Sequence, residues 1–187
     1  MQRFFALTIL LLAACRIAAH GQGPFPLPEP TGSVNDFAHV LDAETVSRLQ
    51  ALSTELDAKT HAEITVVIVD SIGDFPINDY AMELFNHWGI GHDDSRGILI
   101  FLAVSDHKWR IETGNGFKIL FPNERVAKIG ATMVPSLRRA LYSDAVWAAP
   151  AELARIVARD RRASLTSLVA AQPRSLPGAP ISVAKRR

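Results

Sequence analysis

The chain has 187 residues, of which 48% are hydrophobic and 21% are charged, and this length and composition fit one globular domain with short tails. The formal net charge of +1 conceals an uneven distribution, because residues 29–94 carry 13 acidic and 2 basic side chains whereas residues 159–187 carry 1 acidic and 7 basic ones. An acidic body repels phosphate backbones, which argues against nucleic acid as a partner.

The first 19 residues have the features of an export signal. Arg3 precedes an uncharged, mostly apolar run over residues 4–14, which is too short to cross a bilayer. Two processing routes compete, since small residues precede a cleavage site after residue 19 and residues 12–15 match the lipobox of bacterial lipoproteins. We therefore expect an extracytoplasmic protein of the periplasm or outer envelope, with Cys15 as a candidate lipid anchor.

Composition divides the rest of the chain into three parts. Residues 20–32 are rich in proline and glycine and are predicted to form a spacer. Residues 33–158 carry the regular hydrophobic patterns of a folded domain. Residues 159–187 are weakly patterned and basic, and are predicted to form a mobile tail. Cys15 is the only cysteine, so the domain depends on core packing rather than on disulfides.

Helical and strand patterns alternate along the domain. Leucines and valine at helical spacing after Asp42 predict a helix over residues 43–59, with Asp42 as its N-cap. Nearly continuous apolar runs at residues 63–70 and 97–104 predict two buried strands, and the pattern between them predicts a helix over residues 77–88.

The second half of the domain adds one strand and two helices. Residues 109–113 alternate and predict a strand antiparallel to the preceding one. Helices are expected over residues 124–141 and from Pro150, which suits a first helical turn. We expect an α/β protein: a three-layer α/β/α sandwich whose small mixed sheet contains a βαβ unit followed by a hairpin strand and C-terminal helices.

The sequence lacks the usual signatures of covalent catalysis. The sole cysteine lies in the signal region, the six histidines have no zinc-site spacing, and no Gly-x-Ser-x-Gly elbow occurs. Residues 114–116 do not open a βαβ unit, so they are not a dinucleotide fingerprint. Asp70 follows a buried strand, where open sheets place ligands, but an aspartate that begins a loop is the simpler interpretation.

Three segments could bind a divalent cation, Ca²⁺ or Mg²⁺, through hard oxygen ligands. The first contains Asp36, the second contains Asp93 and Asp94 in a glycine-rich loop, and the third contains Asn115 between two glycines. Each has a purely structural alternative: an Asx turn before a helix at Asp36, a solvated acidic turn at the second segment, and a tight turn at Asn115.

These segments resemble, in order and spacing, the TPM domain family of thylakoid lumen, photosystem II repair and receptor-associated proteins. The resemblance covers about residues 33–158 and rests on seven short pieces: VNDFAHVL at 34–41, EITVVIVD at 63–70, DYA at 79–81, LF at 84–85, WGIG at 88–91, GILI at 97–100 and WRIETGNG at 109–116. It implies an exported α/β/α module that takes part in assembly, repair or stabilisation of membrane complexes. Some members of the family are described as phosphatases or as binders of divalent cations.

The chain departs from the family pattern around the suspected cation site. Ser95, Lys118 and Asn123 stand where relatives often carry a carboxylate, which predicts a weak or absent site. Three hypotheses follow: a module that binds envelope or membrane proteins, a metal-dependent phosphatase using Asp36, Asp93 and Asp94, and a membrane-surface protein whose basic tail contacts anionic lipids.

Overall fold

A computed structural model describes residues 25–91 and 94–170. A four-stranded sheet of order β1-β2-β3-β4 forms its centre. The strands are β1 (Val34–Asp36), β2 (Glu63–Val69), β3 (Gly97–Ala103) and β4 (Lys108–Thr113). β1, β2 and β3 are parallel, whereas β4 is antiparallel to β3. The mixed sheet, the βαβ unit through α3 (Ile77–His87) and the hairpin strand are therefore confirmed.

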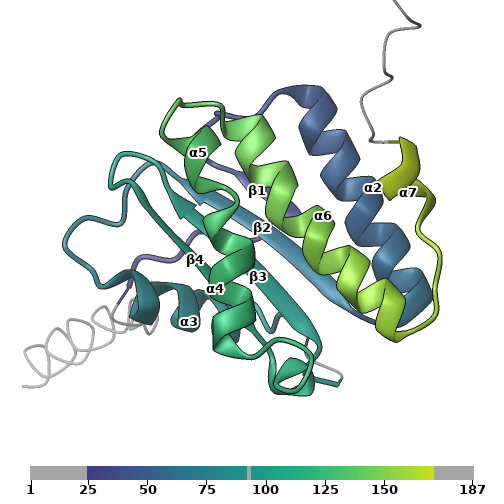
Figure 1. Cartoon of the computed structure of the whole chain (residues 1–187). Coiled ribbons are helices and arrows are strands. Elements are labelled where there is room, and N and C mark those ends of the chain that lie inside the picture. The colour runs from purple at the N-terminus through teal and green to yellow at the C-terminus, as the bar shows by residue number, and fades with distance from the viewer. Residues whose placement is uncertain (1–24, 92–93, 171–187) are drawn as a thin grey trace, which may run out of the picture.

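Helices cover both faces of this sheet and give the expected three layers (Figure 1). On one face α2 (Ala43–Thr60) and α6 (Tyr142–Asp160) lie side by side, with α4 (Asn123–Ala131) and α5 (Val134–Leu137) beside them. Alternate residues of the strands, such as Ile64 and Val66, point into this larger core. Val67 and Phe101 point to the other face, where α3 packs.

The sequence did not predict β1, because three residues are too few to show a period. For residues 34–38 the sequence predicts either a cation-binding segment or an Asx turn that leads into the first helix, and neither is a strand. The segment becomes a strand through parallel pairing with β2, in which Val66 N donates to Ser33 O at 2.8 Å and Phe37 N donates to Ile68 O at 2.8 Å. A strand made by a distant partner leaves little local signal.

The two C-terminal helices also differ from the expectation. The single helix expected over residues 124–141 is split into α4 and α5. Pro135 lies in the first turn of α5, where a backbone N–H has no acceptor within the helix, so proline costs no helical hydrogen bond there. α6 begins eight residues before Pro150, which lies inside it. The buried face of α6, including Val146 and Leu153, offsets the loss of one helical hydrogen bond.

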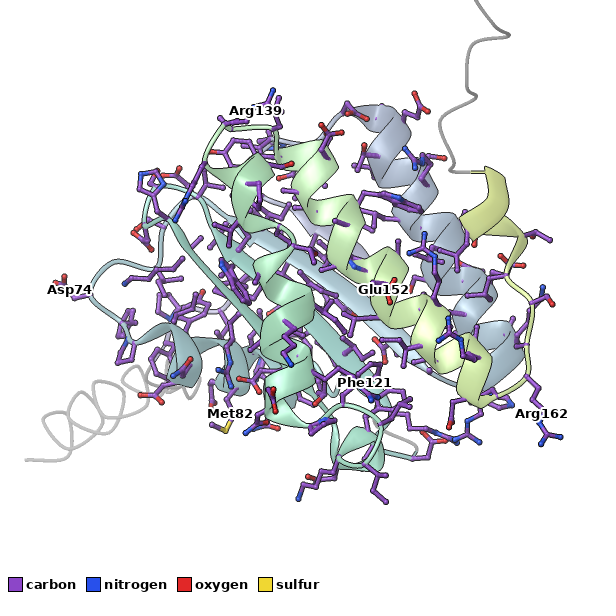
Figure 2. All side chains as sticks on the ribbon, viewed as in Figure 1. Asp74, Met82, Phe121, Arg139, Glu152 and Arg162 are labelled. Atoms are coloured by element: carbon purple, nitrogen blue, oxygen red, sulfur yellow. The ribbon has the colours of Figure 1, made fainter. Side chains whose placement is uncertain are left out.

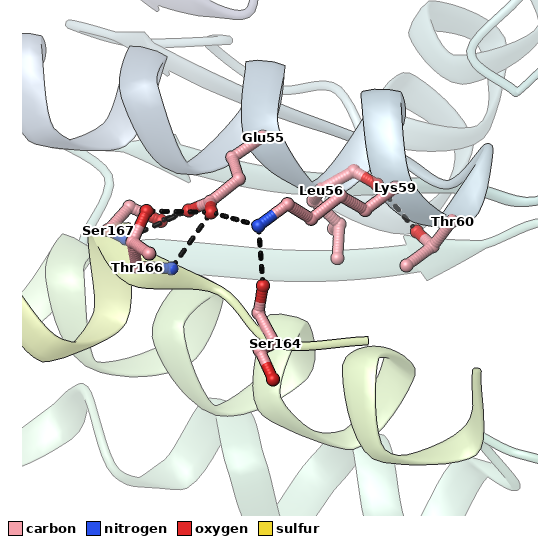
Figure 3. A network of polar contacts seen from close by, with 7 residues as sticks. All are labelled: Glu55, Leu56, Lys59, Thr60, Ser164, Thr166 and Ser167. Carbon is pink, nitrogen blue, oxygen red and sulfur yellow. Dashed lines mark hydrogen bonds and ion pairs between the residues drawn. The ribbon is translucent and has the colours of Figure 1, made fainter. Parts of the chain in front are cut away.

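Regular structure continues beyond residue 158, into the segment expected to be a mobile tail. A short helix, α7 (Thr166–Ala170), packs against α2 through the Glu55 carboxylate (Figure 3). Glu55 Oε1 accepts from Thr166 N and Oε2 accepts from Ser167 N, both at 2.8 Å, and both hydroxyls donate to the same carboxylate. Lys59 Nζ bridges Glu55 to Ser164 O at 2.6 Å.

The chain also packs onto the domain before residue 33. Phe25 and Leu27, in the expected spacer, pack against the smaller core on the α3 face of the sheet. Within the described ranges, no helix is both long enough and apolar enough to cross a membrane.

Candidate functional site

Two glycine-rich loops meet at the end of the sheet where β2 and β3 begin. The first loop follows α3 and leads into Gly97, and the second follows β4 and contains the short helix η1 (Asn115–Phe117). Gly114 N donates to Gly97 O and Gly116 N donates to Ser95 O, both at 2.9 Å. The loops are therefore joined backbone to backbone, and we call this end of the sheet the glycine end.

Close approach explains why glycine is required at this end. A Cβ atom on Gly91 would lie 2.0 Å from Gly97 N, and one on Gly114 would lie 2.1 Å from Ser95 O. Gly91 also has φ +72°, in the left-handed region that other residues avoid. Its N–H donates to Glu63 Oε2 at 2.8 Å, so the first residue of β2 also holds the loop.

A cavity of about 340 Å³ lies between these loops and the end of α3. Its walls combine apolar side chains, side-chain amides and a carboxylate with exposed backbone. They are formed by Met82, Phe85, Asn86, Gly89, Ile90, Gly91, Ser95, Glu112, Thr113, Gly114 and Asn115. An open cavity of this kind suits a protein side chain or a short peptide segment, since it offers both apolar contact and side-chain amides that can form hydrogen bonds.

The charged groups around the cavity are paired with each other. Asp94 forms an ion pair with Arg96, and Arg110 Nε lies 2.6 Å from Glu112 Oε1. Each carboxylate is thus partly neutralised by a guanidinium from its own loop or strand. Asn115, the other expected ligand at this end, is exposed and carries no charge.

This donor set fits a divalent cation poorly. Ca²⁺ and Mg²⁺ favour several carboxylate or carbonyl oxygens around one point. Within residues 25–91 and 94–170, no group of three or more His, Cys, Asp or Glu side chains is placed to hold one metal ion. Asp93 and Cys15 lie outside the described residues.

Asp36 lies at the opposite end of the sheet from Asp94 and Asn115. The register pairs Asp36 with Ile68, near the end of β2, and pairs Gly97 with Glu63, at its start. Ile68 is five steps along the strand from Glu63, which is about 16.5 Å at 3.3 Å per residue. Asp36 and Asp94 therefore do not share a site.

Asp36 and its neighbour Asn35 instead support the local backbone. Asp36 Oδ2 accepts from Leu41 N at 2.8 Å. The side chain of Asn35 is almost fully buried and bonds in both directions: its Oδ1 accepts from Thr31 N at 2.7 Å, and its Nδ2 donates to Gly32 O at 2.7 Å. These contacts hold the backbone on both sides of β1, so a structural role describes the Asp36 segment better than a ligand role does.

Carboxylates also hold the loops at the end of the sheet where β2 and β3 finish, which we call the carboxylate end. Asp70 Oδ1 accepts from Ser105 Oγ at 2.7 Å. Asp106 accepts from Ser71 Oγ and from Ile72 N, both at 2.8 Å. The hydrogen bond from Ile72 N, followed by that from Ser71, lowers the pKa of the Asp106 carboxyl from its ordinary value.

Sequence reasoning missed the part of the cavity that α3 contributes. Met82 is 52% exposed, although it is a large apolar residue in an amphipathic helix, and Figure 2 shows it projecting from α3 into solvent. The helical stripe that buries Ala81 and Leu84 leaves Met82 off the core face. A large apolar residue on the polar face of an amphipathic helix is the sequence signal that could have indicated the role of Met82.

Comparison with known proteins identifies the family. The model of the TPM domain matches residues 34–156, so this chain belongs to the TPM domain family. The match includes every strand of the sheet and both glycine-rich loops. No curated protein sequence matches the chain.

Solved bacterial structures share the fold. The N-terminal domain of a protein from P. gingivalis is 23% identical, with a TM-score of 0.66 over 71% of this chain and 86% of that one. The BA42 protein from Bizionia argentinensis is 17% identical, with a TM-score of 0.55 over 64% and 82%. An N-terminal domain from Corynebacterium glutamicum is 14% identical, with a TM-score of 0.52 over 73% and 84%.

Proposed function

We propose that this protein is an extracytoplasmic TPM module that binds a partner protein of the envelope or membrane at the cavity of the glycine end. The observation that carries the proposal is the combination of an exposed Met82 with a cavity of apolar side chains and side-chain amides beside it. Methionine adapts its shape to varied apolar partners, and side-chain amides such as those of Asn86 and Asn115 can both donate to and accept from a polypeptide backbone.

The paired charges favour binding over catalysis. Asp94 and Glu112 each have a guanidinium partner, which leaves them poor ligands for a catalytic Ca²⁺ or Mg²⁺. Among the described residues, the cavity contains no cysteine or histidine that could act as a nucleophile or a proton acceptor. The proposal therefore assigns the site to protein recognition and derives no step through a metal ion.

Photo-crosslinking in the producing cell tests this assignment. A photoreactive amino acid replaces Met82 in one variant and Glu152 in a matched control. Glu152 lies on α6, on the other face of the sheet, and its side chain is 44% exposed (Figure 2). We expect one dominant crosslinked protein from position 82, identified by mass spectrometry in the envelope fraction, and none from position 152. Equal products from both positions, or none from position 82, would contradict the proposal.

The location and the anchor are part of the same proposal. The apolar run before Cys15 supports export, and lipidation of Cys15 would provide attachment to the membrane. We expect the wild-type chain to fractionate with membranes and the Cys15→Ser variant to appear in the soluble envelope fraction. Release of the wild-type chain in soluble form would show that the ordinary cleavage route is used and that Cys15 is not an anchor.

A further inference from the structure

Residues 25–28 pack across Phe75, Tyr80 and Trp88 on the α3 face of the sheet, and we call the surface beneath them the groove. None of these residues lines the cavity of the glycine end. The ring of Phe25 lies edge-on to Phe75 and Tyr80, with centroid distances of 5.0 and 5.6 Å. Leu27 packs against the same core cluster. Pro26, between these two residues, is exposed. The side chains therefore alternate between core and solvent, as in an extended peptide.

Two aromatic residues hold the backbone of this segment with their polar atoms. Tyr80 Oη donates to Pro26 O at 2.9 Å, and Trp88 Nε1 donates to Pro28 O at 3.0 Å. Both donors come from α3 or its C-terminal cap. The ring of Tyr80 also stacks on Phe101, in β3, with a centroid distance of 5.3 Å, so the sheet helps to hold the ring that carries the hydroxyl.

The sequence of the segment fits such a groove. Prolines at positions 24, 26, 28 and 30 alternate with other residues, so each residue from 25 to 30 either is a proline or precedes one. Proline fixes its own φ, and it restricts the residue before it to extended conformations. A peptide of this kind loses little conformational entropy on binding. Its carbonyl groups have no internal partners and remain available to donors such as those of Tyr80 and Trp88.

From these contacts we propose that the groove formed by Phe75, Tyr80 and Trp88 is a binding site for extended peptides in which prolines alternate with apolar residues. The chain's own residues 25–28 occupy it in cis. A partner segment of the same chemistry binds in trans when it displaces them. Because a tethered ligand has a high effective concentration, the cis segment lowers the apparent affinity for a peptide in trans.

Fluorescence polarisation with a labelled synthetic peptide of residues 23–31 tests this proposal on the full chain. In the variant Phe25→Ser/Leu27→Ser the cis segment loses both of its partly buried apolar side chains. We expect this variant to bind the peptide roughly tenfold more tightly than the wild-type chain does, because the tethered competitor is weakened. The same peptide with serine in place of its phenylalanine and leucine should not bind.

A second pair of substitutions separates a recognition site from simple packing. Trp88→Phe, added to the double variant, keeps an aromatic ring but removes the N–H that donates to Pro28 O, and we expect it to weaken peptide binding several-fold. The matched control is Trp147→Phe on α6, where the ring packs under Arg48, and this change should leave binding unaltered. If the double variant does not fold, Leu27→Ala alone provides the comparison.

Two outcomes would overturn the proposal. The first is a variant that binds the peptide no more tightly than the wild-type chain, or with an affinity that Trp88→Phe does not alter. The second is concentration-dependent dimerisation of the wild-type chain through exchange of residues 25–28, with no binding of the free peptide. The groove would then be a contact between copies of this chain rather than a peptide site.

Discussion

The glycine end and the carboxylate end of the sheet hold their loops in different ways. At the glycine end, backbones pack against each other, so glycine is needed at Gly91 and Gly114. At the carboxylate end, the side chain of Asp106 holds the loop that follows β2 by accepting a hydrogen bond from Ile72 N. In that loop, Gly73 has no atom near the place where a Cβ would lie. Glycines at the first end are therefore fixed by sterics, whereas loops at the second end depend on ionised side chains.

Substituting one glycine at each end gives the largest expected effect. Gly91 and Gly73 have similar positive φ values, +72° and +62°, so alanine costs a similar conformational energy of about 1 kcal/mol at both. Gly91→Ala adds a collision with Gly97 N, and we expect it to lower the free energy of unfolding by about 3 kcal/mol in total. Urea denaturation of both variants measures the difference.

Gly73→Ala is the control in that experiment, since it isolates the conformational cost. Equal losses of stability in the two variants would mean that the loops at the glycine end move apart freely. The close backbone contact between Gly91 and Gly97 would then contribute nothing to the loss of stability in Gly91→Ala.

The carboxylate contacts should give the molecule a pH dependence, which Glu55 illustrates most clearly. Partial burial raises the pKa of the Glu55 carboxyl, but hydrogen bonds from Lys59, Ser167 and Thr166 outweigh burial and hold this pKa well below its ordinary value of 4.5. A carboxyl with a lowered pKa in the folded state stabilises the fold above its unfolded pKa, and this contribution is lost as the pH falls. Glu55→Gln should cost about 1–2 kcal/mol at neutral pH.

The difference in unfolding free energy between wild type and Glu55→Gln should shrink as the pH falls below about 4.5, because the protonated wild type no longer has the charge-assisted contacts. Denaturation at several pH values measures this difference. Glu152→Gln is the control, since Glu152 forms only an exposed ion pair with Arg155 and should change stability little. A constant difference across the acid range would show that the charge of Glu55 does not hold α7.

The smallest expected effect is local and lies at the carboxylate end. In Asp106→Asn the amide nitrogen of the new side chain cannot accept a hydrogen bond, so one of the bonds from Ser71 Oγ and Ile72 N is lost. We expect hydrogen exchange at the Ile72 amide to become several-fold faster, while exchange at Gly91 stays unchanged. Faster exchange at both amides would mean that the two ends are coupled, and the contrast between them would not hold.

Sequence patterns predicted most of the fold. The apolar runs of β2 and β3 and the helical spacing in α2 and α3 are signals that lie within one segment of the chain. All four of these elements are present in the structure. β1 and the early start of α6 were missed. β1 exists through pairing with a strand some 30 residues away, and α6 passes through Pro150 because its face is buried against other elements.

The candidate site was predicted in its residues but not in its arrangement. The sequence identified both glycine-rich loops, and the structure joins them through Gly114 and Gly97. It also grouped Asp36 with Asp94, although the parallel register places these residues at opposite ends of β2. Spacing along the chain does not reveal which end of a strand a loop will reach, because that depends on strand direction and order.

The sequence by itself therefore determined the TPM family, the α/β class and the positions of the glycine loops, since these follow from local composition, hydrophobic periodicity and ordered motifs. Only the tertiary structure decided which charges are paired, which carboxylates hold a backbone, and that the proline-rich residues 25–28 lie in a groove formed by α3. Those outcomes depend on contacts between residues far apart in the chain, and such contacts form only when the sheet and its helices come together.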